Sequence, residues 1–284
     1  MVSDYRCYFC FARAFETLLE NEKLSLEDKN SFVREMSELY SAVGNSFSSP
    51  EYSRALHVIL RKYTNNPDPY KLAKKQSNDL VMSMYSDLKN QIQHSANPFD
   101  TALRLAIAGN IMDFAIGSNF DLQATITKVL QTDFAIDHSK KLQEAISKAK
   151  TVLYLGDNCG EIVFDKLFIE TINHPNLMYA VRGATIINDA TIDDAHYVGM
   201  NLVANILSNG YDAPSTIVKK CSKDFQDVFN RADVIISKGQ GNLEGLLDNK
   251  TNEIYFLLMV KCQAIADALA VKKGDFVVKK NTEI

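Results

Sequence analysis

The chain has 284 residues, of which 46% are hydrophobic and 23% charged, the mixture of an ordinary folded protein rather than a disordered one. A formal net charge of -4 argues against a strongly basic surface, so we expect no nucleic-acid partner. The apolar run at residues 256–260 is far shorter than the roughly 20 residues that span a bilayer. With no secretory signal and five scattered cysteines, we expect a cytoplasmic protein that does not enter membranes.

Residues 1–147 have the pattern of helices. Ser25 and Asp28 resemble a capping box in front of a helix whose apolar residues recur at helical spacing. The prolines within 66–69 break the chain, and a further helix follows through Met84.

Two more helices complete this half. Asn97 and Pro98 begin one of them, and Gly117 is a suitable end for it. The second covers about 138–149.

After Lys150 the pattern changes to short apolar runs that alternate with helical stretches. The runs expected as strands are 151–155, 177–181, 202–203, 234–236 and 254–260, followed by a helix at 263–269 and an edge strand at 276–278. Such alternation indicates a mostly parallel sheet covered on both faces. We therefore predict an α/β fold, with a helical N-terminal domain (1–147) packed on a Rossmann-like α/β/α sandwich (148–284).

Polar segments that contain glycine follow three of the expected strands. They are residues 156–161, residues 182–189, and residues 237–242. Because ligands of open parallel sheets bind beyond the carboxyl ends of the strands, these segments are expected to converge on one site.

The residue types in these segments indicate what the site binds. Asp157, Asn158 and Asp189 offer only oxygen ligands, which suit Mg²⁺ or Mn²⁺. Arg182 and Lys238 add positive charge where an anionic phosphoryl group would need it. Each feature alone has a plainer interpretation as a turn, a helix cap or a solvated lysine. Their position at one edge of one sheet favours a functional site.

The same segments closely resemble the damage-control phosphatase family, known as Domain of Unknown Function 89 and as acidic-residue methyltransferase-like. The matching stretches are 155–165, 182–183 with 187–191, 237–242, 108–114, and the tail at 256–262 and 271–277. Cys7 and Cys10 form a CxxC similar to that of the smaller prokaryotic-type members. We expect this pair to begin a helix and pack, with a structural or regulatory metal role as the alternative, because no second knuckle exists for a zinc ribbon.

The resemblance implies metal-dependent hydrolysis of phosphate monoesters of small metabolites, with a divalent ion (Mg, Mn, Co or Ni). It implies that Asp157, Asn158 and Asp189 bind the metal and that Asp157, Glu161 and Lys238 take part in catalysis. The residues expected to contact the phosphate or the rest of the substrate are Asn110, Asp113, Arg182, Asn188, Lys238, Gly239 and Asn242. Cys159 stands where many members have a smaller residue.

Several alternatives stay open at this point. The nucleophile is either a water held by the metal or Asp157 itself, and Glu161 is a candidate general base. A carboxyl methyltransferase that uses S-adenosylmethionine is the main rival function, although Arg182 stands where an acidic residue would usually receive ribose hydroxyls. A non-catalytic protein that binds a phosphometabolite is the second. Sugar phosphates, phosphopantetheine and damaged cofactor phosphates are all candidate substrates, and the oligomeric state is open.

Overall fold

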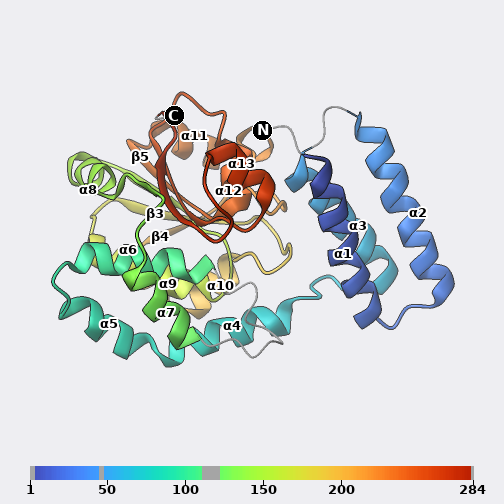
Figure 1. The fold of residues 1–284 in the computed structure, drawn as a ribbon, viewed down its shortest axis with the longest axis horizontal. Helices are drawn as coiled ribbons and strands as arrows, with labels where there is room; N and C mark the ends of the chain where they lie inside the picture. The colour runs from blue at the N-terminus through green and yellow to red at the C-terminus, as the bar shows by residue number, and fades with distance from the viewer. Residues whose placement is uncertain (1–3, 45–47, 111–121, 283–284) are drawn as a thin grey trace.

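The computed structural model describes residues 4–44, 48–110 and 122–282. The first part of the chain is helical, as the sequence predicts. Its helices are α1 (Tyr5–Asn21), α2 (Leu26–Val43), α3 (Ser49–Thr64), α4 (Lys71–Ser83), α5 (Tyr85–Gln93), α6 (Pro98–Ala108), α7 (Leu122–Gln131) and α8 (Ser139–Lys148). Helices α1–α3 stand together at one end of the molecule (Figure 1).

Side chains cap two of these helices at the expected places. The Ser25 hydroxyl accepts a hydrogen bond from the backbone N–H of Asp28 (3.1 Å) at the start of α2. The amide oxygen of Asn97 likewise accepts from the N–H of Asp100 (3.2 Å) at the start of α6. Each cap satisfies a helix N–H that has no partner within the helix.

The second part is built on one seven-stranded sheet with the order β1-β7-β6-β5-β2-β3-β4. All strand pairs are parallel except β6 with β7. The strands are β1 (Ile136–Asp137), β2 (Val152–Leu155), β3 (Leu177–Val181), β4 (Asn205–Ser208), β5 (Val234–Lys238), β6 (Ile254–Met259) and β7 (Phe276–Lys280). The helices that connect or follow them are α9 (Glu161–Ile172), α10 (Ile192–Tyr197), α11 (Lys223–Arg231), α12 (Gly239–Leu246) and α13 (Gln263–Leu269), with short 3₁₀ turns η3 (Met200–Leu202) and η4 (Val218–Lys220). The predicted mixed α/β fold is confirmed.

Alternate residues of the central strands face opposite layers. In β2, Val152 and Tyr154 join a core that includes residues of α5, α6 and α9, whereas Leu153 and Leu155 join a core that includes residues of α11, α12 and α13. A strand buried on both faces needs apolar residues at every position, which is why β2 is a continuous apolar run.

Two strand predictions were wrong. The expected edge strand, now β7, lies inside the sheet, because the two residues of β1 pair with its outer side. The strand expected at 202–203 is displaced to β4, since Met200–Leu202 form a 3₁₀ turn. Both errors came from segments of two or three residues, for which local pattern carries little information. The expected helix end at Gly117 lies outside the described residues.

The hydrophobic cores divide the chain elsewhere than at the expected domain boundary near residue 147. Helices α1–α3 share a core of their own, which includes Phe15, Phe32 and Leu56. By contrast, α5 and α6 pack into the same core as the sheet, and β1 belongs to the sheet itself. Among the described helices, none is both long and apolar enough to cross a membrane.

Candidate functional site

The three polar segments lie at the carboxyl ends of β2, β3 and β5, which are neighbours in the sheet. From β2 the chain continues to β3 and β4 on one side, while β5, β6 and β7 lie on the other. This reversal of strand order is the switch point at which open α/β sheets form a ligand crevice.

Asp157 lies at the centre of the site, directly after β2. One carboxylate oxygen, Oδ1, accepts a hydrogen bond from Arg182 Nη2 (3.1 Å). The other, Oδ2, accepts from the side-chain amides of Asn158 (3.2 Å) and Asn110 (3.4 Å). Gly239 allows this position, because a Cβ there would lie 1.9 Å from Oδ2. Its φ of +77° also favours glycine.

Arg182, which follows β3, connects the two candidate metal-binding carboxylates. Its Nε donates to Asp189 Oδ2 (2.6 Å) and its Nη2 to Asp157 Oδ1 (3.1 Å). Its Nη1 donates to Asn242 Oδ1 (2.9 Å). Although burial alone would lower the pKa of Arg182, pairing with Asp189 and Asp157 raises it. The guanidinium thus stays charged and fixes both carboxylates.

Backbone contacts also bring residues 157–159 and 188–190 together. Asn158 and Asp189 form an isolated antiparallel bridge. The N–H of Cys159 donates to the carbonyl of Asn188, and the N–H of Ala190 to the carbonyl of Asp157, both at 2.8 Å. The three predicted metal ligands therefore lie in two segments that are hydrogen-bonded to each other.

Lys238 is fully buried in an ion-pair cluster and does not line the pocket beside Asp157 and Asp189. Its Nζ contacts Glu161 Oε1 (2.6 Å) and Asp165 Oδ1 (2.5 Å), and donates to the carbonyl of Ala106 (2.8 Å). These three contacts use the donors of the ammonium. To reach a phosphate, Lys238 would have to give one of them up.

Asn242 and Asn110 differ in how completely they are bonded. Asn242 donates to the carbonyls of Gly156 (3.1 Å) and Lys238 (2.8 Å), so it ties the segments after β2 and β5 together. Asn110 donates to Asp157 and Glu161, but no described residue provides its buried Oδ1 with a hydrogen-bond partner. An oxygen of this kind is typical of a site that a cation or a water completes. Asp113 lies outside the described residues.

The buried charges of the site are unbalanced. Among the described residues of the site, four buried carboxylates (Asp157, Glu161, Asp165, Asp189) accompany two buried cations (Arg182, Lys238), so with each of these ionised the negative charges exceed the positive by two. Burial, reinforced by Asp189 and Glu161, raises the pKa of Asp157 well above its usual range, although Arg182 opposes this. Burial also raises the pKa of Asp165 to about 6 despite its pairing with Lys238. A divalent cation would offset such an excess.

The predicted ligand atoms are of the kind that a hard divalent ion prefers. Asp157, Asn158 and Asp189 provide oxygen atoms, and the buried oxygen of Asn110 lies beside them. Among the described residues, no three histidine, cysteine, aspartate or glutamate side chains are grouped so that they could hold a metal on their own. The set consists of two carboxylates and amides, a composition that Mg²⁺ completes with water and substrate oxygens.

The site opens into a pocket of about 800 Å³ between the sheet and helices α1, α3 and α4. Asp157, Asn158, Asn188 and Asp189 form its floor. The volume is within the range of small-molecule sites and far exceeds that of a phosphate group alone.

Sequence reasoning missed two residues that the structure brings to the site. Asn78 of α4 accepts a hydrogen bond from the N–H of Gly160 (2.6 Å) through its side-chain oxygen, and so holds the turn that precedes α9. Lys261 lines the pocket and lowers the pKa of Asp157. Lys261 comes just after β6, so the rule that located the other segments also applies to it. No local signal marks Asn78, because its partner is 82 residues away.

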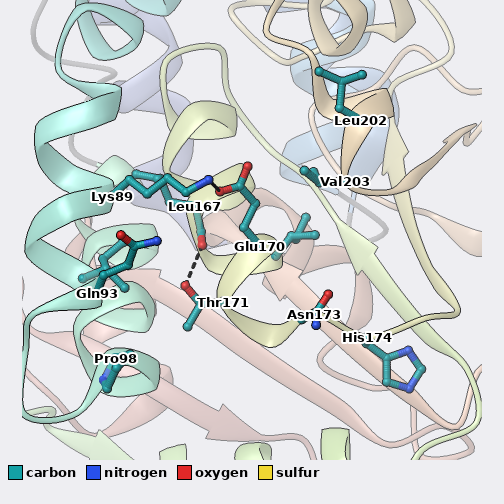
Figure 2. A pocket seen from close by; sticks show the side chains of 12 residues that line it. Lys89, Gln93, Pro98, Leu167, Glu170, Thr171, Asn173, His174, Leu202 and Val203 are labelled. Atoms are coloured by element: carbon teal, nitrogen blue, oxygen red, sulfur yellow. Dashed lines mark hydrogen bonds and ion pairs between the residues drawn. The ribbon is translucent and has the colours of Figure 1, made fainter.

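A second pocket, of about 640 Å³, lies beside the C-terminal half of α9 (Figure 2). Lys89 and Glu170 form an ion pair across it (2.6 Å), and Thr171 donates to the carbonyl of Leu167 (2.8 Å). None of the candidate site residues lines this pocket.

The fold and the position of the site define a Rossmann-like α/β protein whose acidic crevice lies at the strand-order switch point. Residues 3–277 match the family described as the Damage-control phosphatase ARMT1-like domain, and the chain belongs to that family.

Relatives extend over the whole chain. "Damage-control phosphatase PH1575" of Pyrococcus horikoshii is 32% identical and covers 99% of both chains. "Damage-control phosphatase" of Archaeoglobus fulgidus is 29% identical over 90% of this chain and 92% of its own. The crystal structure of the Pyrococcus protein, described as a DUF89 family protein, superimposes with a TM-score of 0.90 over 99% of both chains. These names support a phosphatase role for this chain.

Proposed function

We propose that the protein is a metal-dependent phosphomonoesterase that acts on a small phosphorylated metabolite. The observation that carries this proposal is the cluster of four buried carboxylates with two cations, open to an 800 Å³ pocket on the side of Asp157 and Asp189. Names of related proteins support the phosphatase part of the proposal. The metal, the substrate class and the residue roles are inferred from the site.

In this proposal Asp157, Asn158 and Asp189 hold a divalent ion, which when bound supplies positive charge for the phosphoryl oxygens. Arg182 keeps both carboxylates in place through its bonds of 3.1 Å and 2.6 Å. Lys261, the basic side chain among the described lining residues, is suited to bind the phosphate.

Lys238 is assigned a different role from the one the sequence suggested. Its contacts with Glu161 and Asp165 make it a positioning residue that keeps Glu161 beside Asn110 and Asn158. Glu161 Oε2 accepts from both amides, at 3.1 Å and 3.4 Å, and thereby orients their oxygens.

A metal-by-substrate screen tests the proposal. Protein stripped with a chelator is assayed for phosphate release from a panel of phosphometabolites with Mg²⁺, Mn²⁺, Co²⁺ or Ni²⁺. We expect activity that requires added metal, and its loss in Asp189→Asn but not in Asp193→Asn, a matched change at an exposed position. Calorimetric titration with the metal alone should show binding to the wild type and weakened binding to Asp189→Asn.

Metal-independent activity, or equal metal binding by both variants, would contradict the proposal. Tight binding of S-adenosylmethionine without phosphatase turnover would favour the methyltransferase alternative. Binding of phosphate and metal without turnover of any ester would favour the non-catalytic alternative.

A further inference from the structure

Helix α4, which passes beside α9 (Figure 1), has a buried face that is polar. Tyr70 in front of the helix and Ala73 line the pocket of the candidate site. Lys74 and Asn78 follow on the same side, one helical turn apart, and are only 3% and 1% exposed. The buried face of a helix is normally apolar, and burying a lysine or an asparagine costs free energy unless its polar atoms are bonded. The contacts of these two side chains therefore indicate what this face of α4 does.

Asn78 is bonded to the segment that contains the predicted ligands Asp157 and Asn158. Its Oδ1 accepts a hydrogen bond from the backbone N–H of Gly160 at 2.6 Å. Gly160 has a φ of +80° and lies directly in front of α9, so the chain turns sharply between Asn158 and the helix. Asn78 thus fixes the turn that joins the two predicted ligands to α9.

Lys74 is bonded to the segment that follows the predicted ligand Asp189. Its Nζ lies 2.6 Å from Asp194 Oδ2, and the two side chains are only 4% and 17% exposed. The same carboxylate oxygen accepts from the N–H (2.9 Å) and the hydroxyl (2.7 Å) of Thr191, two residues after Asp189. Lys74 therefore holds the end of this segment through Asp194 and Thr191.

The two contacts of α4 reach both parts of the candidate metal site. Asp157 and Asp189 carry like charges, which repel each other in a buried setting. Arg182 joins the two carboxylates directly, at 3.1 Å and 2.6 Å. Helix α4 instead joins the backbone turns next to them, through one side chain for each turn. A single helix bonded to both turns limits how far the two segments can move apart.

We propose that Lys74 and Asn78 are positioning residues of the metal site. They act through the backbone at Thr191 and Gly160, and so hold the predicted ligands at the separation that a divalent ion requires. This proposal rests on the metal binding in the proposed function and adds two residues to that site. Side chains that orient the ligands of a metal typically change its affinity about 10–100-fold when they are removed.

Calorimetric titration of the chelator-stripped protein with Mn²⁺ alone tests the proposal. We expect Lys74→Met and Asn78→Leu to raise the Kd for Mn²⁺ about 10–100-fold, because each change roughly keeps the size of the side chain and removes its polar contact. Asn78→Asp keeps an oxygen that can accept from the N–H of Gly160, and its negative charge lies near the N-terminus of α9. Asn78→Asp should therefore bind Mn²⁺ much more tightly than Asn78→Leu.

Controls separate positioning from general damage to the fold. Lys75→Met and Gln76→Leu make comparable changes on the exposed face of α4 and should leave the Kd unchanged. Lys166→Met removes a buried lysine of α9 whose ammonium donates to the carbonyl of Val198 (2.9 Å), beyond both segments. Lys166→Met should lower the stability to urea without changing the Kd for Mn²⁺.

Circular dichroism shows whether each variant is folded. If Lys74→Met does not fold, Thr191→Val provides a milder change, because it removes only the hydroxyl that donates to Asp194 Oδ2. Thr191→Val should raise the Kd for Mn²⁺ in the same direction but by less. An unchanged Kd in Thr191→Val and in folded Asn78→Leu would then count against the proposal.

The outcomes separate this proposal from the proposed function. An unchanged Kd in folded Lys74→Met and Asn78→Leu overturns the positioning role and leaves a metal-dependent phosphatase standing. Equal weakening in Lys166→Met, or no recovery in Asn78→Asp, also overturns the role, because the loss would then follow stability rather than geometry. The expected pattern of Kd values without turnover of any ester supports the positioning role and overturns the phosphatase.

Discussion

At the scale of single residues, the site depends on one glycine that faces one carboxylate. Gly239 begins α12 in the left-handed region, and a methyl group at its Cα would collide with Asp157 Oδ2 at 1.9 Å. Gly274 has a similarly positive φ of +94°, but no atom of the described residues lies within 4 Å of the position of its Cβ. A side chain at either glycine would strain the backbone, but only at Gly239 would it also collide with another residue.

Alanine at these two positions should therefore give different results. Both Gly239→Ala and Gly274→Ala should lose about 1 kcal/mol of stability from the left-handed backbone. Only Gly239→Ala should also displace Asp157, and we expect it to weaken metal binding and phosphatase activity about 10–100-fold. Urea denaturation and metal titration of both variants measure the two effects. Unchanged metal binding in Gly239→Ala would show that Asp157 does not bind the ion.

Lys238 is the cation that balances two buried carboxylates, Glu161 and Asp165. In Lys238→Met, Glu161 and Asp165 lose the cation that lies 2.6 Å and 2.5 Å from them in a fully buried setting. Removing one partner of a buried ion pair costs about 3–5 kcal/mol. Lys223→Met, which breaks an exposed pair with Asp227, should have little effect. Urea denaturation measures the free energy of unfolding of both variants, with a chelator present so that metal binding does not contribute. Equal free energies of unfolding would argue against a buried ion-pair cluster around Lys238.

At the scale of elements, helix α3 carries a histidine whose surroundings favour the neutral imidazole. His57 is buried, with Nδ1 at 2.8 Å from the carbonyl of Ser53 and Nε2 at 3.2 Å from the hydroxyl of Tyr70. Burial, aided by the charge of Arg61, lowers its pKa to about 4, although the Ser53 carbonyl opposes this. The folded protein thus binds this proton less readily than the unfolded chain, whose histidines titrate near about 6.5.

This difference in pKa between the folded and unfolded states makes the stability of the protein depend on pH. Above pH 6.5 both states are neutral at His57, so its contribution to stability does not change with pH. Between pH 6.5 and 4 the unfolded state gains the proton first, and up to about 3 kcal/mol of stability should be lost. Urea denaturation at pH 7, 6, 5 and 4 should show a smaller loss in His57→Gln than in the wild type. His94→Gln, at an exposed position, is the control; an identical pH profile for His57→Gln would refute the assignment.

At the scale of the whole molecule, helices α1–α3 form a unit that polar contacts help attach to the rest. Arg54 pairs with Asp212 (2.5 Å), and Arg61 donates to the carbonyl of Thr185 (2.9 Å). Arg6 pairs with Asp267 of α13 (2.8 Å). Because the core of α1–α3 is separate from the two cores of the sheet, we expect this unit to open without unfolding them.

Loss of one attachment should loosen this unit selectively. Arg54→Ala removes the pair with Asp212 and the stacking of Arg54 over the ring of Tyr211 (5.1 Å). A partly exposed pair is worth up to about 1 kcal/mol, so amides of α1–α3 should exchange hydrogen up to about fivefold faster. Amides of β2 and β5 should not change. Arg34→Ala, whose side chain contacts Ser31 of its own helix, should leave both sets unchanged; uniform acceleration across the sheet would contradict independent opening.

The sequence predicted the helices and strands whose apolar residues recur at a regular spacing. The structure places β3 and α13 at the expected residues, because consecutive positions in each of these segments follow a single period. The sequence did not predict β1, whose two residues are a strand only because β7 lies beside them. Similarly, the site segments were located by the strand-end rule, but the bonding of Lys238 to Glu161 and Asp165 depends on how α9 packs under β5.

The sequence by itself determined the chemistry of this protein: which strands are buried on both faces, and which oxygen-bearing segments follow them. Only the tertiary structure decided which charges neutralise one another, and that Asn78 and Lys261 lie beside the segments around Asp157. The physical reason is the separation along the chain of the residues that interact. Periodicity and strand ends are set by neighbours along the chain, whereas ion pairs and pocket walls are made by residues tens to more than a hundred positions apart, whose distances only the packed fold fixes.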